Sequence, residues 1–506
     1  MNVPTHTEVL VIGGGPGGSY AAAALAREGI EAVVLEADLF PRYHIGESMI
    51  ASVRHFLRII GLDEKFDNYG FTRKVGAAFK LNDFKREGYT DFLARGPQNY
   101  AWNFIRSESD ELMFRYAGEC GAKIFDGIKV TDLISQTGDI VSTRPTSAHW
   151  KSKSGSFGII TFDYLIDASG RAGILSTKYL KTRTFNQELK NVATWGYWTG
   201  CSVYGAGTPR NNSPFFEALQ AALLLALVAI DESGWAWMIP LHNGTTSVGI
   251  VMNQEISNKK KANHPSGRSP SMQEHYLEQL KFAPSILALV GPGELVKDAT
   301  TGSVVKSASD YSYSASSYAG DHYRIVGDAG AFIDPFFSSG VHLALAGALS
   351  AALSICAARR GDCTEEEAAV WHSSRVSTSF SRFLVVVLAA YKQMRAQAQP
   401  ILASADEPDF DRAFEQFRPV IQGSADVDHS TSARHASEAG SGCARPIEFC
   451  EQSDTTRPGG DSTAPKGPMW KTRTEDTFHI DHFATGVING FCPRLERGSL
   501  GLTPVD

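Results

Sequence analysis

A glycine-rich turn between two short β-branched runs constrains the fold of this chain more than any other feature. Residues 8–12 (EVLVI) predict a strand, residues 19–28 (SYAAAALARE) predict a helix, and residues 31–35 (EAVVL) predict a second strand. A strand, a tight turn, a helix and a further strand build a parallel sheet when they follow in this order. The chain is therefore expected to begin with an α/β unit.

The turn has the spacing that binds the pyrophosphate of a dinucleotide. It contains G-x-G-x-x-G, and its glycines are Gly13, Gly14, Gly15, Gly17 and Gly18. The first glycine of the motif permits the turn, the second lets the backbone approach a phosphate, and the third lets helix and strand pack closely. Glu36 follows the second strand, where a carboxylate can accept hydrogen bonds from ribose hydroxyls.

Length and composition narrow the functional class. The chain has 506 residues, 43% of them hydrophobic, and a net charge of −7. This length predicts two or more structural units, and the mild acidity argues against nucleic acid or an anionic membrane as a partner. The most apolar run, residues 221–230, is shorter than the roughly 20 residues that cross a bilayer. With no signal-peptide pattern after Met1, we expect an intracellular, cytoplasmic protein.

The cysteines and the runs of charged residues indicate no additional functional site. The seven cysteines lie singly, without C-x-x-C spacing, and predict neither a disulfide framework nor a metal site. Residues 259–261 form the only notable basic run, and we expect them in a solvated loop.

Three later segments favour FAD as the dinucleotide, by resemblance to the flavin monooxygenase superfamily. Residues 324–330 (RIVGDAG) resemble its second FAD fingerprint, which implies that Asp328 holds the ribityl chain. Residues 167–170 (DASG) resemble a turn near the cofactor, and Arg106 resembles the arginine that begins the helix beside the flavin. Taken singly, each has an ordinary alternative, namely a buried capping aspartate or an arginine in a surface ion pair.

The number of dinucleotide-binding motifs indicates where the reducing equivalents come from. No second complete G-x-G-x-x-G occurs in the chain, so a separate nicotinamide domain is not expected. Reduced FAD is then expected from a separate flavin reductase or, alternatively, from a nicotinamide that binds transiently.

Residues 235–240 (WAWMIP) match W-x-W-x-I-P, the motif of the flavin-dependent halogenases. On a strand, Trp235 and Trp237 point to the same face. The resemblance implies that these indoles keep an aromatic substrate away from the flavin, so that oxygen passes to a halide. The alternative is that both are ordinary core residues, which is the usual environment of tryptophan.

Residues 332–340 (FIDPFFSSG) fit the halogenase pattern F-x-x-P-x-x-S-x-G. The resemblance implies that Ser339 and Gly340 bind chloride, chiefly through backbone N–H groups, and that the N–H of Val341 faces the flavin ring. A helix predicted over residues 341–358 supports this assignment, because the N-terminus of a helix is a natural anion site.

Residues 76–81 (GAAFKL) resemble the segment around the essential lysine of the same family, which assigns that role to Lys80. Such an amine either carries chlorine as a chloramine or polarises hypochlorous acid by hydrogen bonding. A free lysine has a pKa of about 10.4, so a nucleophilic amine must be desolvated. The alternative is a surface lysine at the end of a strand.

Three further segments resemble the fungal phenolic halogenases that decorate polyketides: residues 41–49 (PRYHIGESM), 85–90 (KREGYT) and 493–498 (PRLERG). Within the first, Glu47 is implied as a cofactor contact. Tryptophan halogenases have a glutamate where this chain has Phe337, which favours a phenol that activates its own ring. Residues 221–230 look inserted, either as a helix over the substrate entrance or as an artefact of how the coding sequence was assembled.

The resemblance implies an α/β fold of the FAD-binding, Rossmann-like flavin monooxygenase type with an interleaved substrate-binding β-sheet. We expect residues 1–80, 100–190 and 300–360 in the FAD-binding domain, and residues 81–99 and 191–299 on the substrate side. Residues 361–422 and 476–506 are expected to form a C-terminal helical region. The Ser-, Gly- and Pro-rich residues 423–475 are expected to form a flexible linker.

Together these patterns predict an enzyme that uses reduced FAD, oxygen and chloride to chlorinate an electron-rich phenol through hypochlorous acid. An FAD monooxygenase that hydroxylates an aromatic shares every cofactor motif, but it does not explain W-x-W-x-I-P or the chloride loop. A non-catalytic binding protein with a flavoprotein fold is the third possibility, and the complete glycine motif speaks against it.

Overall fold

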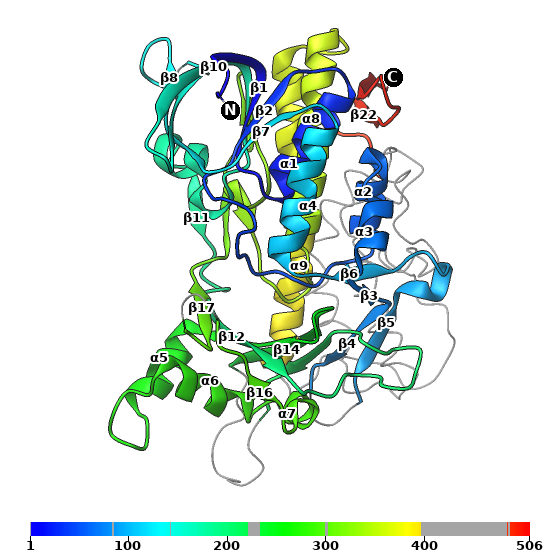
Figure 1. Ribbon diagram of the computed structural model, residues 1–506, viewed down its shortest axis with the longest axis vertical. Coiled ribbons are helices and arrows are strands. Elements are labelled where there is room, and N and C mark those ends of the chain that lie inside the picture. The colour runs from blue at the N-terminus through cyan, green and yellow to red at the C-terminus, as the bar shows by residue number, and fades with distance from the viewer. Residues whose placement is uncertain are drawn as a thin grey trace, which may run out of the picture.

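The computed structural model describes residues 2–82, 86–141, 143–220, 233–298, 302–395, 483 and 486–505. These residues form two large sheets with helices packed against them (Figure 1). The predicted insertion at residues 221–230 and the predicted linker at residues 423–475 lie outside the described residues.

The first sheet is the predicted parallel one. Its central order is β19-β20-β10-β1-β2-β7, and β8 and β9 extend it from β10. The four contacts β20–β10, β10–β1, β1–β2 and β2–β7 are all parallel. The bounds are β1 (His6–Ile12), β2 (Ala32–Leu35), β7 (Lys123–Phe125), β8 (Ile128–Ser135), β9 (Pro145–Ser152), β10 (Phe157–Asp167), β19 (Ala319–Gly320) and β20 (Tyr323–Ile325).

Three helices pack on one face of this sheet. Helix α1 (Pro16–Arg27) lies between α4 (Arg106–Glu119) and α8 (Gly340–Arg360) (Figure 1). Four consecutive alanines, residues 21–24, are buried in α1, and their small side chains allow close helix packing. Helix α8 is long and apolar enough to cross a membrane, but 89% of its apolar window is buried in the protein, as is typical of a core helix.

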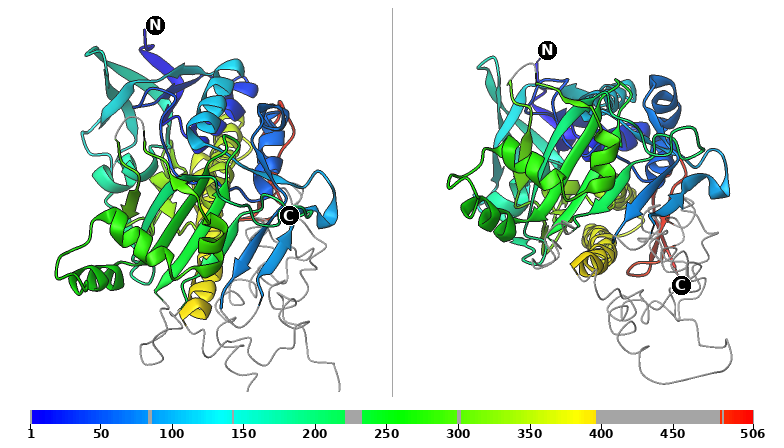
Figure 2. Two further views of the ribbon diagram at one scale, coloured as in Figure 1. Left: turned by 60° about the horizontal axis from the view of Figure 1, so that its bottom comes forward. Right: turned by 90° about the horizontal axis from the view of Figure 1, so that it is seen from below.

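The second sheet is mostly antiparallel, in the order β16-β12-β15-β14-β13-β4-β5. Figure 2 shows its green strands continued at one edge by the blue strands β4 and β5. Its strands are β4 (Gly76–Lys80), β5 (Gly88–Asp91), β12 (Asn191–Thr199), β13 (Phe215–Ala218), β14 (Gly234–Pro240), β15 (Thr246–Asn253), β16 (Glu294–Leu295) and β17 (Lys306–Ser309), the last of which pairs with β12.

The two faces of the second sheet belong to different cores. One face joins the main core, which it shares with the first sheet and with α9 (Glu365–Arg395). The other packs under α6 (Met272–Leu280) and α7 (Pro284–Val290). Because side chains alternate along a strand, each residue of β4 and β14 belongs to one core or the other.

The fold class is confirmed, and the structure corrects four details of the sequence interpretation. The predicted C-terminal helical region at residues 476–506 contains the antiparallel strands β22 (Phe491–Arg494) and β23 (Gly501–Pro504). Strand β4 pairs in the second sheet, although residues 1–80 were predicted in the FAD-binding part, and β17 does so from within residues 300–360. Both pairings are long-range, so no local pattern reports them. Residues 259–261 end helix α5 (Gln254–Ala262) rather than forming a loop, and their charges are favourable at a helix C-terminus.

The glycine turn is closed by direct backbone contact. A Cβ placed at Gly18 would lie 1.9 Å from the carbonyl oxygen of Gly13, a distance that no real side chain tolerates. A Cβ at Gly17 would lie 3.4 Å from Cγ2 of Val326, which is ordinary van der Waals contact. The two neighbouring positions therefore differ sharply in what they can accept.

We predict that Gly18→Ala lowers the free energy of unfolding by about 3 kcal/mol or more, because helix and strand must separate. Gly17→Ala is the matched control and is expected to lower it by less than about 1 kcal/mol, because alanine favours the helix and fits. Urea unfolding followed by circular dichroism measures both. Equal stability of the two variants would contradict the contact.

Candidate active site

The phosphate-binding turn has the geometry that an anion requires. Gly13 has φ +102°, and a Cβ there would lie 2.2 Å from the carbonyl oxygen of Ala168, so the predicted DASG turn packs directly against it. At Gly15, the residue before α1, a Cβ would meet only a guanidinium nitrogen of Arg42, at 3.3 Å. The backbone on this side therefore faces open space beside a cation, which suits a phosphate.

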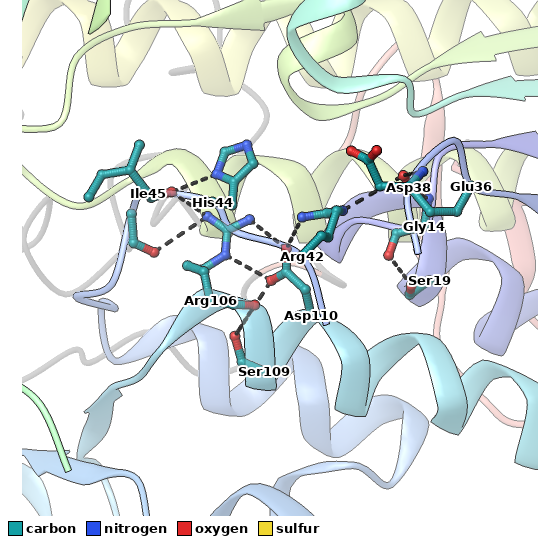
Figure 3. Close-up of polar contacts among 11 residues, drawn as sticks. Gly14, Ser19, Glu36, Asp38, Arg42, His44, Ile45, Arg106, Ser109 and Asp110 are labelled. Carbon is teal, nitrogen blue, oxygen red and sulfur yellow. Dashed lines mark hydrogen bonds and ion pairs between the residues drawn. The ribbon is translucent and has the colours of Figure 1, made fainter. Parts of the chain in front are cut away.

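Glu36 lies at the mouth of this turn, as predicted (Figure 3). Its carboxylate accepts the N–H of Gly14 at 2.6 Å and the N–H of Asp38 at 2.9 Å, and Arg42 Nε lies 3.7 Å away. These contacts fix the carboxylate, and its two oxygens keep lone pairs for ribose hydroxyls.

Arg106 is a buried structural cation rather than part of a surface ion pair. It donates two hydrogen bonds to Asp110, at 2.8 and 3.0 Å, and one to the carbonyl oxygen of Ile45 at 2.7 Å (Figure 3). Arg42 Nη1 lies 3.1 Å from the same aspartate. Although burial raises it, the pKa of Asp110 is held below its ordinary value by these two guanidinium groups. The network fixes the first turn of α4 next to the 41–48 loop.

Two predicted cofactor contacts, Asp328 and Glu47, lie close enough to Arg106 for its positive charge to lower the pKa of their carboxyl groups. Burial raises the pKa of Asp328 to about 6, and Arg106 opposes the rise. Burial also raises the pKa of Glu47 to about 7, again opposed by Arg106. The hydroxyl of Tyr313 donates to the Asp328 carbonyl oxygen at 2.8 Å and fixes this turn. The open glycine turn, Glu36 and this acid–arginine cluster together fit the phosphates, ribose and ribityl chain of FAD.

Trp235 and Trp237 share one face of β14, as predicted. Their rings lie 5.8 Å apart, centroid to centroid, and both belong to the main core, whereas Ala236 faces the opposite core. Trp235 is 1% exposed, and its ring contacts that of Phe336 at 5.0 Å, edge to face. The tryptophan face of β14 is thus directed at the 332–340 loop.

That loop enters α8 with the geometry of an anion site. The N–H of Phe336 donates to Asp334 Oδ1 at 3.0 Å, and Ser338 has φ +56°, which turns the chain sharply before the helix. The first helical hydrogen bond joins the N–H of Leu343 to the carbonyl oxygen of Ser339 at 2.9 Å. The N–H groups of Gly340 and Val341 precede it and lack helical acceptors, so they can bind an anion.

One hydroxyl connects the tryptophan strand to the loop. The hydroxyl of Tyr391, on α9, donates to Asp334 Oδ2 at 2.9 Å. It accepts hydrogen bonds from Trp235 Nε1 at 2.8 Å and from Asn191 Nδ2 at 2.9 Å. Burial raises the pKa of Asp334 to about 7. No local sequence pattern predicts this network, because its four members come from distant parts of the chain.

Comparisons with known proteins agree with this geometry. The family model described as Tryptophan halogenase matches residues 8–98 and 93–438. A flavin-dependent halogenase of Acremonium egyptiacum is 52% identical over 534 residues, covering 99% of this chain and 93% of the relative. The chain belongs to the flavin-dependent halogenases.

Two further similarities extend the comparison. The sulochrin halogenase of Aspergillus terreus is 50% identical to this halogenase over 542 residues, covering 100% of this chain and 95% of the relative. The structure of the myxobacterial chondrochloren halogenase superposes with a TM-score of 0.68 at 26% identity, covering 83% of this chain and 91% of that one. The halogenase thus has the family's α/β fold and uses FAD and a halide.

The structure does not bring Lys80 together with the tryptophans. In β4, Phe79 faces the main core, so Lys80 points to the opposite face, towards α7. Its Nζ donates to Ser285 Oγ at 3.2 Å and lies 4.0 Å from Oε1 of the buried Glu217. Transfer from the indoles to Lys80 conflicts with this geometry, because the sheet lies between them. The resemblance assigned the role to Lys80, and the structure places this side chain on the far face of the sheet from the tryptophans.

A second lysine, six positions earlier, is the buried amine of this region. Lys74 ends β3 (Thr72–Lys74), is 1% exposed, and donates from Nζ to Ser48 Oγ at 2.9 Å. Burial lowers the pKa of Lys74 to about 7. Ser48 pairs with Asn103, whose amide donates to the carbonyl oxygen of Pro240 at 3.3 Å, so the amine lies near the end of the tryptophan strand. Because Thr72 and Arg73 precede it directly, no local apolar pattern marks Lys74 as buried.

We predict that Tyr391→Phe lowers the free energy of unfolding by about 2 kcal/mol, because it leaves the buried Trp235 N–H without its acceptor and removes a donor to Asp334. Tyr311→Phe is the matched control, since the nearby Tyr311 hydroxyl is buried and has no hydrogen-bond partner among the described residues. That variant is expected to be as stable as the wild type. Tryptophan fluorescence during urea unfolding measures both, and an equal loss in both variants would contradict the network.

A second prediction concerns the charge of Lys74. Between about pH 7 and 10 the unfolded chain holds a proton on this lysine that the folded protein releases, so burial costs most below pH 7. Lys74→Met should therefore be more stable than wild type at pH 6.5, and its advantage should shrink by up to about 1.4 kcal/mol per pH unit towards pH 10. Urea midpoints across this range test it, and a constant difference would contradict a neutral buried amine.

Proposed function

We propose that this halogenase chlorinates an electron-rich phenol of the polyketide type, with Lys74 as the amine that directs the chlorine. The observations that carry the proposal are the contact of Trp235 with the loop at residues 332–340 and the buried amine near the Pro240 end of the same strand. The sulochrin halogenase, a full-length relative at 50% identity, supports the substrate class, because sulochrin is a phenolic metabolite.

Phe337 supports a phenol over an indole substrate. It occupies the position where tryptophan halogenases place a glutamate, and its ring is buried against Phe336 at 4.7 Å and Phe79 at 5.8 Å. The site therefore has no carboxylate at this point to assist the ring under attack. A phenol needs none, because its own hydroxyl donates electrons into the ring.

Bound FAD, once reduced, supplies the activation of oxygen, and the chain's own residues determine where the oxidising equivalent goes. The N–H groups of Gly340 and Val341 hold chloride at the start of α8. The rings of Trp235 and Trp237 exclude the phenol from the flavin, so that chloride is oxidised first. Hypochlorous acid then reaches Lys74, whose nitrogen either accepts chlorine or donates a hydrogen bond to it, and the phenol carbon exchanges its hydrogen for chlorine.

The depressed basicity of Lys74 suits this task. A charged ammonium has no lone pair to accept chlorine, whereas a neutral amine does. Since burial lowers the pKa of Lys74 to about 7, a large share of the amine is neutral near neutral pH. Chlorination through a chloramine should therefore rise as the pH increases through 7.

Two further aspects of the function belong to the same proposal. A separate flavin reductase is proposed as the source of reduced FAD, because the sequence carries a single G-x-G-x-x-G. An intracellular, cytoplasmic location also stays a prediction.

We predict that the protein, incubated with FAD, a flavin reductase, NADH, chloride and a panel of phenols, gives products heavier by one chlorine in place of one hydrogen. Lys74→Met should reduce chlorination by at least about a hundredfold, while NADH oxidation and peroxide formation continue. Lys80→Met is the matched control and should retain activity within about threefold.

The same assay separates the alternatives by product mass. Hydroxylated products would support a monooxygenase, and no turnover across a broad panel would support a binding protein. Normal chlorination by Lys74→Met, or its loss in Lys80→Met alone, would return the role to Lys80.

A further inference from the structure

A continuous row of polar groups leads from the protein surface to a buried carboxyl group. The hydroxyl of Tyr197, on β12, donates to Glu47 Oε1 at 2.5 Å. The hydroxyls of Tyr197 and Tyr43 lie 3.0 Å apart, and Trp195 Nε1 donates to the Tyr43 hydroxyl at 2.8 Å. We call Tyr43, Tyr197 and Glu47 the hydroxyl relay.

The inner end of the hydroxyl relay is sealed and has a free acceptor. Glu47 is 3% exposed, and its second oxygen, Oε2, has no hydrogen-bond partner among the described residues. A buried carboxyl oxygen without a partner costs free energy unless a ligand or reacting group uses it. Ser247 lies beside Glu47 and accepts the indole N–H of Trp237 at 3.1 Å, so this carboxyl group lies next to the tryptophan face.

The outer end of the hydroxyl relay meets solvent. Tyr43 is 49% exposed and borders a cleft that Glu47, Tyr197 and Lys306 also line. Lys306 Nζ lies 4.5 Å from the centre of the Tyr43 ring and forms an ion pair with Asp298 at 2.7 Å. Water in this cleft can therefore exchange protons with Tyr43, whereas Oε2 of Glu47 is buried away from it.

The overall reaction needs such a path. Reduced FAD, oxygen, chloride, one proton and a phenol balance against FAD, a chlorophenol and two waters. Each turnover therefore consumes one proton. Trp235 and Trp237 are 1% and 5% exposed, so a proton that reaches them must cross the protein along groups that can pass it on.

We propose that the hydroxyl relay delivers this proton from the cleft to the buried site, an inference that rests on the proposed halogenation. Glu47 gives up a proton from Oε2 inside the site and regains one at Oε1 from Tyr197. Tyr197 takes the proton of Tyr43, and Tyr43 takes one from water. Rotation of the carboxyl group and of both hydroxyls restores the starting arrangement.

The charges around the hydroxyl relay suit this role. Arg106 faces Glu47 from α4, and Ser247 faces it from β15, while Asp298 and Lys306 lie beside Tyr43. Burial raises the pKa of Glu47 to about 7, where a group can both accept and release protons near neutral pH. Because the hydrogen bond from Tyr197 stabilises the charged form, its loss should raise this pKa further.

The first test interrupts the hydroxyl relay at its exposed end. Tyr43→Phe should lower the chlorination rate at least about tenfold and make it depend on buffer, with small acids such as imidazolium restoring it. Tyr197→Phe should show the same loss. Tyr164→Phe is the matched control, because Tyr164 also donates to a glutamate, Glu365, but far from the site. Wild-type rates in both relay variants, or a loss that no buffer acid restores, would overturn the proposal.

The second test needs no turnover, so it separates failure of the relay from failure of the proposed halogenation. A pH jump in the full-length protein, with and without FAD, is followed by the infrared C=O stretch of protonated Glu47, which Glu47→Gln identifies by its absence. Tyr43→Phe should slow the appearance of this band at least about tenfold, while Tyr164→Phe leaves it unchanged. An unchanged rate in Tyr43→Phe would overturn the relay even if phenols are chlorinated.

Discussion

The hydroxyl of Tyr391 holds together the parts on which the active site depends. Its three hydrogen bonds join the tryptophan strand, the loop at residues 332–340 and strand β12. All the groups are buried, and a buried polar group left without a partner costs about 1–3 kcal/mol. The indole of Trp235 and the loop that enters α8 are therefore fixed relative to each other before any ligand binds, as a barrier between flavin and substrate requires.

Strand alternation then assigns every side chain of the second sheet to one of two environments. The face with Phe79, Trp235 and Trp237 meets the FAD-binding sheet, and the face with Ala236 and Lys80 meets α6 and α7. The buried amine of Lys74 comes from β3, which lies outside the second sheet and pairs with β6 (Ala101–Asn103). A shift of one residue in strand register would exchange the side chains on the indole face with those on the face that packs against α6 and α7.

Most of the features that were predicted correctly came from short sequence motifs. The glycine turn, the shared face of the tryptophans and the helix start after Ser339 follow from local spacing, and the structure agrees with each. The role of Lys80 rests on a resemblance and stays a prediction, although alternation from the buried Phe79 points its side chain away from the tryptophan face. Tyr391 and the hydroxyl relay were not predictable, because hydrogen bonds between residues 150 or more positions apart leave no pattern in the sequence.

We propose that the halide binds at the start of α8, on the flavin side of the two indoles, with the amine of Lys74 beyond them. A crystal structure with FAD and bromide, recorded at the bromine absorption edge, tests it directly. We predict an anomalous peak within hydrogen-bond distance of the N–H groups of Gly340 and Val341, with Trp235 and Trp237 between it and Lys74. Bromide bound elsewhere, or an open path from the flavin to the amine that bypasses both rings, would contradict it.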